Sequence, residues 1–135
     1  MNFDQLRNAV SGRLKLWDSG EHQEALRLLD DSISKAIEER ENSWVSTLSH
    51  HAAILCGFEP DRRLVKHYYE LSLTHNPENP MALYGLAKVA LEEGELQIAK
   101  QFATRCYRAI LQGNDEVVKQ GLLDLVLLHW PEVGK

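Results

Sequence analysis

The sequence contains few residues that could form covalent or metal cross-links. It has only two cysteines, Cys56 and Cys106, and both lie within apolar segments. Two thiols provide neither a disulfide framework nor a complete set of zinc ligands. We therefore expect both cysteines to be buried packing residues in a reducing compartment.

Long apolar runs are also missing. No segment approaches the roughly 18 to 20 consecutive apolar residues that a bilayer-spanning helix needs. The N-terminal sequence MNFDQLRNAV lacks the basic start and the apolar stretch of a secretion signal. These absences favour a soluble protein of the cytoplasm.

Motifs that carry chemistry are absent as well. The chain has no nucleophile signature, no glycine-rich phosphate loop and no paired-carboxylate motif. His50 and His51 precede Cys56, but adjacent helical residues point about 100° apart, and neither histidine has a ligand type three or four residues away. We expect no enzyme activity, no cofactor and no metal. Catalysis by residues scattered along the chain is the alternative left open.

Positive charge is the minority charge in this chain. The 135 residues include 15 Lys and Arg against 20 Asp and Glu, which gives a formal net charge of −5. This field repels nucleic-acid phosphates and anionic lipids, so neither is an expected partner. With 44% hydrophobic residues the chain can bury a core, and its length is that of one domain, 1–135.

Apolar residues recur at spacings of three and four almost from end to end, and no stretch alternates in the manner of a strand. Glycine, proline and asparagine interrupt this pattern at short turns. The pattern predicts seven helices, at 3–18, 21–41, 44–56, 61–75, 79–93, 95–111 and 114–130. Such short connections force consecutive helices to pack as antiparallel hairpins.

The helical pattern repeats. The turn residues Gly20, Pro60 and Gly94 are separated by 40 and then 34 residues. Three further sets share these intervals, namely Ala25, Val65 and Ala99, then Leu29, Tyr69 and Ala103, then Ser32, Ser72 and Cys106. A fixed period of this length is typical of stacked helix hairpins.

The segment 80–107 resembles the tetratricopeptide repeat family, whose period is 34 residues. The matching residues are Leu83, Leu86, Ala87, Ala90, Gly94, Ala99, Ala103 and Cys106. The resemblance implies an all-α fold of antiparallel hairpins stacked as a right-handed superhelix, with repeats near 6–45, 46–79 and 80–113 and a capping helix at 114–130. It also implies burial of the packing residues Ala53, Leu86, Ala87, Ala99 and Ala103.

In this family the first helix of each hairpin lines a concave groove. Carried onto this sequence, the groove residues are Val10, Leu14, Trp17, His50, Ile54, Phe58, Met81, Tyr84, Lys88 and Leu91. Such a mainly apolar lining suits the nonpolar face of a helix or an extended segment. For Trp17, Phe58 and Leu91 the alternative is that they only close the hairpin turns.

The terminal helix is more apolar than a cap requires. Leu123, Leu127 and Trp130 are expected on one side and other apolar residues on another, which implies two neighbours. One face would pack on helix 95–111, leaving the other for a second copy or a partner. Deep burial against that helix and the C-terminal tail is the alternative.

These features predict an adaptor that binds a peptide or helix of another protein in its groove. The alternatives are a structural module that forms a homodimer through the terminal helix, or a specialised chaperone for a secreted protein.

Overall fold

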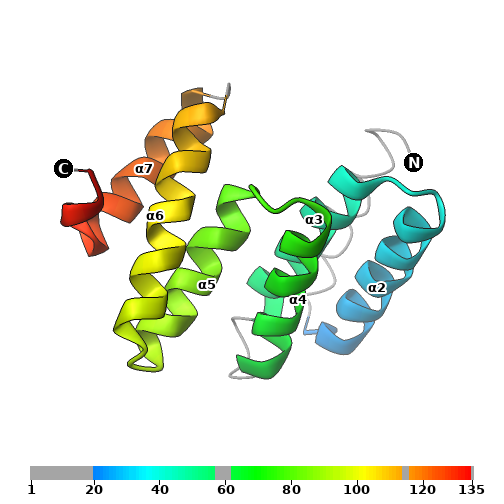
Figure 1. The fold of residues 1–135 in the computed structure, drawn as a ribbon. Coiled ribbons are helices and arrows are strands. Elements are labelled where there is room, and N and C mark those ends of the chain that lie inside the picture. The colour runs from blue at the N-terminus through cyan, green and yellow to red at the C-terminus, as the bar shows by residue number, and fades with distance from the viewer. Residues whose placement is uncertain (1–19, 57–61, 114–115, 135) are drawn as a thin grey trace. The chain divides into compact units, whose positions relative to one another are not determined.

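A computed structural model describes residues 20–56, 62–113 and 116–134 (Figure 1). Every regular element in these ranges is a helix, which confirms the predicted all-α class. The elements are α2 (His22–Glu38), α3 (Asn42–Cys56), α4 (Arg62–His75), α5 (Pro80–Glu92), α6 (Leu96–Gln112), α7 (Glu116–His129) and the short 3₁₀ helix η1 (Pro131–Gly134). The helix predicted at 3–18 lies outside the described residues.

The chain divides into two compact units, Met1–Asn76 and Pro77–Lys135. In the first unit, α3 packs against both α2 and α4. In the second, α5 packs against α6, and α6 in turn contacts α7 and η1.

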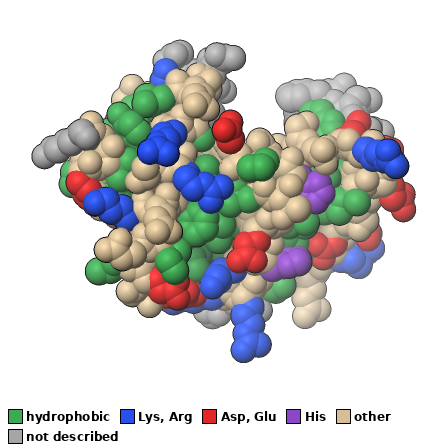
Figure 2. Space-filling view, in the orientation of Figure 1, with side chains coloured by type: hydrophobic (Ala, Val, Ile, Leu, Met, Phe, Trp, Pro, Cys, Tyr) green, Lys and Arg blue, Asp and Glu red, His purple; other side chains and the backbone are tan. Residues whose placement is uncertain are grey.

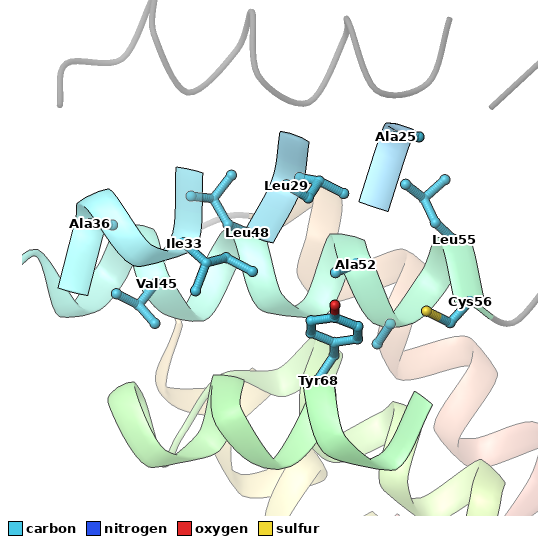
Figure 3. Close-up of a cluster of buried hydrophobic side chains, with 11 residues drawn as sticks. Ala25, Leu29, Ile33, Ala36, Val45, Leu48, Ala52, Leu55, Cys56 and Tyr68 are labelled. Atoms are coloured by element: carbon cyan, nitrogen blue, oxygen red, sulfur yellow. The ribbon is translucent and has the colours of Figure 1, made fainter. Parts of the chain in front are cut away.

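The core of the first unit lies between α2, α3 and α4. Helix α2 contributes one buried stripe at helical spacing, Ala25, Leu29, Ile33 and Ala36. These side chains face apolar residues of α3, and Tyr68 projects from α4 toward them (Figure 3). The Tyr68 hydroxyl donates to Asp30 Oδ1 at 2.6 Å, so α4 is also linked to α2 by a polar contact.

Small residues form the contact between α5 and α6. Ala82, Ala87 and Ala90 of α5 are buried. Ala99 and Ala103 of α6 are fully buried. In the other unit, Ala53 of α3 is also buried, at 1% exposure. Small side chains allow helix axes to approach to about 8 to 10 Å. The predicted burial of Ala53, Leu86, Ala87, Ala99 and Ala103 is confirmed.

One hydrogen bond recurs at the predicted 34-residue period. In the first unit, buried Ser72 of α4 donates through Oγ to the carbonyl of Ser46 in α3 at 2.8 Å. In the second, the buried Cys106 thiol of α6 donates to the carbonyl of Pro80 in α5 at 3.3 Å. Ser46 and Pro80 are 34 residues apart, as are Ser72 and Cys106. The α3–α4 and α5–α6 hairpins therefore share this contact at corresponding positions.

Candidate protein-binding surfaces

Helix α5 begins at a well-formed N-terminal cap. The Asn79 side chain accepts hydrogen bonds from the backbone N–H groups of Met81 at 3.0 Å and Ala82 at 3.4 Å. Pro80 follows at the first helical position, where a missing N–H costs nothing. This cap fixes where the helix starts.

Four of the predicted groove residues lie on one side of α5. Met81, Tyr84, Lys88 and Leu91 are half-buried, whereas the residues between them on the other sides are buried. Their spacings of three, four and three residues align them along the helix. We call these four residues the α5 strip. It presents large apolar and aromatic surface with a single cation.

Tyr84 contributes an uncharged phenol to the α5 strip. Burial, together with the nearby Cys106, raises the pKa of Tyr84 above its ordinary value. Burial likewise raises the pKa of the Cys106 thiol to about 12. Both groups are protonated near neutral pH, so Lys88 is the one charged side chain of the strip.

The accessible side of α3 differs from the predicted one at His50. Ile54 is half-buried as expected, but His50 is only 9% exposed. The half-buried residues on the side of Ile54 are Thr47 and His51. Because α3 is packed by helices on two sides, its accessible arc is narrow and excludes His50.

The imidazole rings of His50 and His51 contact each other at a tilt, with their centroids 4.5 Å apart. Burial, and secondarily the neighbouring His51, lowers the pKa of His50 to about 3. Burial also lowers the pKa of His51. Helix α3 contains no Asp, Glu, Lys or Arg, so its accessible side is uncharged near neutral pH. The other predicted groove residues, Val10, Leu14, Trp17 and Phe58, lie outside the described residues.

Helix α7 buries residues that were expected on two different sides. Leu122, Val126 and Trp130 are buried, Leu123 and Leu127 are half-buried, and Leu125 and Leu128 are exposed. Trp130, expected on the same side as Leu123 and Leu127, is only 4% exposed. The 3₁₀ helix η1 explains the partial burial of Leu127, because a Cβ added to Gly134 would lie 2.8 Å from Leu127 Cδ2.

Sequence reasoning missed the apolar residues that α7 leaves in solvent. Leu125 is 43% and Leu128 is 73% exposed, and they lie three residues apart on one side of the helix. The spacing of Leu125 and Leu128 can be read from the sequence. The periodicity does not predict which of the several apolar sides of α7 packs on α6, because that depends on the tertiary contact between the two helices.

The described part of the chain contains neither a metal-binding cluster nor a membrane-spanning helix. In residues 20–56, 62–113 and 116–134, no group of three His, Cys, Asp or Glu side chains is arranged to hold a metal ion. None of the helices in these ranges combines the length and apolar character needed to cross a membrane.

Comparison with known proteins supports the fold. No protein-family model matches the sequence. No curated protein matches it either. Among solved structures, the chain is similar to the type III secretion translocator chaperone SycD of Yersinia enterocolitica, crystallised as an alternative dimer. The TM-score is 0.64 at 16% identity, covering 95% of this chain and 96% of that one. The chain therefore shares the all-helical, tetratricopeptide-like fold of SycD, while the family assignment remains a prediction from the residue pattern.

Proposed function

We propose that this chain is a non-catalytic protein-binding module of the cytoplasm. Its α5 strip would hold an apolar segment of a partner, either a helix or an extended peptide. The observation that carries the proposal is the alignment of Met81, Tyr84 and Leu91 as large, half-buried side chains on one side of α5. Aromatic and aliphatic anchors of this kind supply most of the energy of peptide binding.

Lys88 narrows the chemistry of the partner segment. It lies one helical turn beyond Tyr84 in an otherwise uncharged strip. An acidic side chain opposite Lys88 would be favoured, and a basic one would be repelled. The partner segment is therefore expected to be mainly apolar, with an acidic residue beside its anchors.

The proposal is tested by affinity capture from the native organism with matched variants. Tyr84→Glu should weaken capture of the partner by about tenfold to a hundredfold, because it places a charge at an apolar anchor of the α5 strip. Ser34→Glu, at an exposed site on α2, adds the same charge and should leave capture unchanged. Leu83→Ala, in the core, should instead lower the free energy of unfolding by about 2 to 5 kcal/mol.

The outcome separates binding from folding. By circular dichroism and urea denaturation, the Tyr84→Glu variant should be folded and near wild type in stability. If the variant is unfolded, Tyr84 belongs to the core. If it folds and still captures the same partner, the proposed binding surface is wrong.

A second candidate is a chaperone for a secreted protein. The fold shared with the translocator chaperone SycD favours it. This role predicts that the captured partner is a secreted protein that aggregates when expressed without the chain. If the chain is instead an adaptor, the captured partner should fold and stay soluble without it. Co-expression of the captured partner with and without the chain distinguishes the two.

Homodimerisation is a further possibility that the alternative dimer of SycD favours. The exposed Leu125 and Leu128 of α7 are the candidate contact, in place of the predicted Leu123, Leu127 and Trp130. Sedimentation of the wild type should then show a dimer, and Leu125→Glu with Leu128→Glu should give a monomer. A strictly monomeric wild type at high micromolar concentration would reject self-association.

A further inference from the structure

Helix α6 carries charge of one sign only. Within Leu96–Gln112 it has the three cations Lys100, Arg105 and Arg108 and no Asp or Glu, in a chain whose formal net charge is −5. All three basic residues are exposed, and Lys and Arg side chains are visible over α6 in Figure 2. Helix α6 is therefore positively charged, whereas the chain as a whole is negatively charged.

The solvent side of α6 is continuous. Ala99, Ala103, Cys106 and Ile110 are buried on one side of the helix. The opposite side consists of exposed residues spaced at three and four, Gln97, Gln101, Arg105, Arg108 and Gln112, with Lys100 at its border. We call this set the α6 face. Exposed Ile98 and Leu111 lie beside it near its two ends.

The cations of the α6 face are not neutralised within the described chain. Arg105 donates to the carbonyl of Pro77 at 3.4 Å, and its guanidinium lies 5.6 Å from the centre of the Phe102 ring. Neither contact supplies a negative charge. Lys100 and Arg108 have no ion pair or side-chain hydrogen bond with any described residue.

Helix α2 shows the contrasting arrangement. Its exposed Arg27 is flanked by the carboxylates of Glu24 and Asp31, which it contacts at 2.5 Å and 3.0 Å. Such local pairing is the usual state of a solvated helix surface. On α6, no carboxylate occupies the corresponding positions one turn away from Lys100 or Arg108.

We propose that the α6 face is a second binding surface, one that takes an acidic segment of a protein partner. Lys100 and Arg108 are two turns apart, or about 12 Å along the axis. Carboxylates spaced by about two turns on a partner helix match this separation. The exposed Ile98 and Leu111 beside it would add apolar contact. The surface is distinct from the α5 strip, so the inference does not depend on the proposed function.

The net charge of the chain argues against the other anionic classes. Nucleic acids and anionic bilayers are extended fields that a chain of charge −5 repels as a whole. A short acidic segment meets the three cations without approaching the acidic remainder of the surface. Charge complementarity over a helix-sized patch therefore favours a protein partner.

The test uses a fluorescein-labelled, glutamate-rich helical peptide and a counterpart in which glutamine replaces glutamate. Fluorescence anisotropy at low ionic strength should show binding of the acidic peptide alone, with affinity falling as salt is added. Lys100→Glu combined with Arg108→Glu should reduce the affinity about tenfold or more, because like charges then face each other.

A matched control changes the net charge equally on another helix. Arg62→Glu with Arg63→Glu places the same charges on exposed positions of α4. Once added salt screens the long-range effect of net charge, the affinity of this variant should be within about twofold of wild type. Circular dichroism should show that both double variants are folded.

Several outcomes would overturn the proposal. They are no binding of the acidic peptide, equal binding of the glutamine peptide, or equal loss in both double variants. Binding of phosphatidylserine vesicles or duplex DNA that depends on Lys100 and Arg108 and exceeds peptide binding would assign the α6 face to lipid or nucleic acid instead.

Discussion

Two helices of this chain end in the same backbone turn but place different residues at its left-handed position. After α2, Arg40 N–H donates to the Ile37 carbonyl and Glu41 N–H to the Ala36 carbonyl. After α5, Gly94 and Glu95 make the same pair of bonds to the preceding turn. The φ values of Arg40 and Gly94 are 56° and 79°. Glycine suits this conformation, whereas a residue with a Cβ is strained in it.

Arg40→Gly should therefore stabilise the chain. The left-handed conformation costs a residue with a Cβ about 1 to 2 kcal/mol, and the greater entropy of unfolded glycine offsets part of the gain. We expect the free energy of unfolding to rise by about 0.5 to 1 kcal/mol, measured by urea denaturation. Gly94→Ala is the matched control and should lose about 1 kcal/mol, because the added Cβ meets no atom within 4 Å and only backbone strain acts. A destabilised Arg40→Gly variant would contradict this account.

At the scale of the helices, the repeat period explains most of what could be predicted. The predicted bounds of the helices after residue 20 agree with the structure to within a few residues, because glycine, proline and asparagine mark the ends. Burial of Ala87, Ala99 and Ala103 was predictable for a related reason. Small residues at a fixed period are needed wherever two helices pack closely.

The sides of the helices were harder to predict than their ends. On α5, Met81, Tyr84, Lys88 and Leu91 are half-buried along one side, and the residues between them on the other sides are buried. On α3, packing from two sides buries His50. On α7, several sides are equally apolar in sequence, so the choice of Trp130 over Leu125 as a packing residue depends on the tertiary contact. Periodicity specifies that a helix has a buried side, and the neighbours decide which one.

The recurring hydrogen bond between the helices of each hairpin gives a test at this scale. Ser72 also lies 2.8 Å from the Ser46 hydroxyl, so Ser72→Ala removes two buried hydrogen bonds. We expect the free energy of unfolding to fall by about 1 to 3 kcal/mol in urea denaturation. Ser72→Cys installs the residue of the second hairpin and should lose less.

Thr74→Ala provides the control for this prediction. Thr74 donates to Glu70 within the same helix at an exposed site, so its removal should change stability by less than about 0.5 kcal/mol. Equal losses in Ser72→Ala and Thr74→Ala would show that the contact between helices has no special weight.

At the scale of the whole chain, stability should depend on pH through the uncharged interior of the first unit. Helix α3 lies between two helices and buries His50 beside the half-buried His51. Since burial disfavours the charged imidazolium, the pKa of His50 falls from 6.5 to about 3. In the unfolded chain the same imidazole has its ordinary pKa of about 6.5. Between these two values the unfolded state binds a proton that the folded state does not.

The free energy of unfolding should therefore fall as the pH is lowered from about 6.5 toward 3 and be insensitive to His50 above that window. His50 alone should account for a loss of about 1.5 to 2 kcal/mol between pH 6.5 and 5, because one pKa unit corresponds to about 1.4 kcal/mol. Urea denaturation across this range measures the slope. His50→Gln removes this titrating group and should reduce the slope, leaving the part due to His51, whose pKa burial also lowers. His67→Gln, at an exposed site on α4, should keep the wild-type slope. A slope unchanged in His50→Gln would show that His50 is protonated in the folded chain and that other groups cause the acid sensitivity.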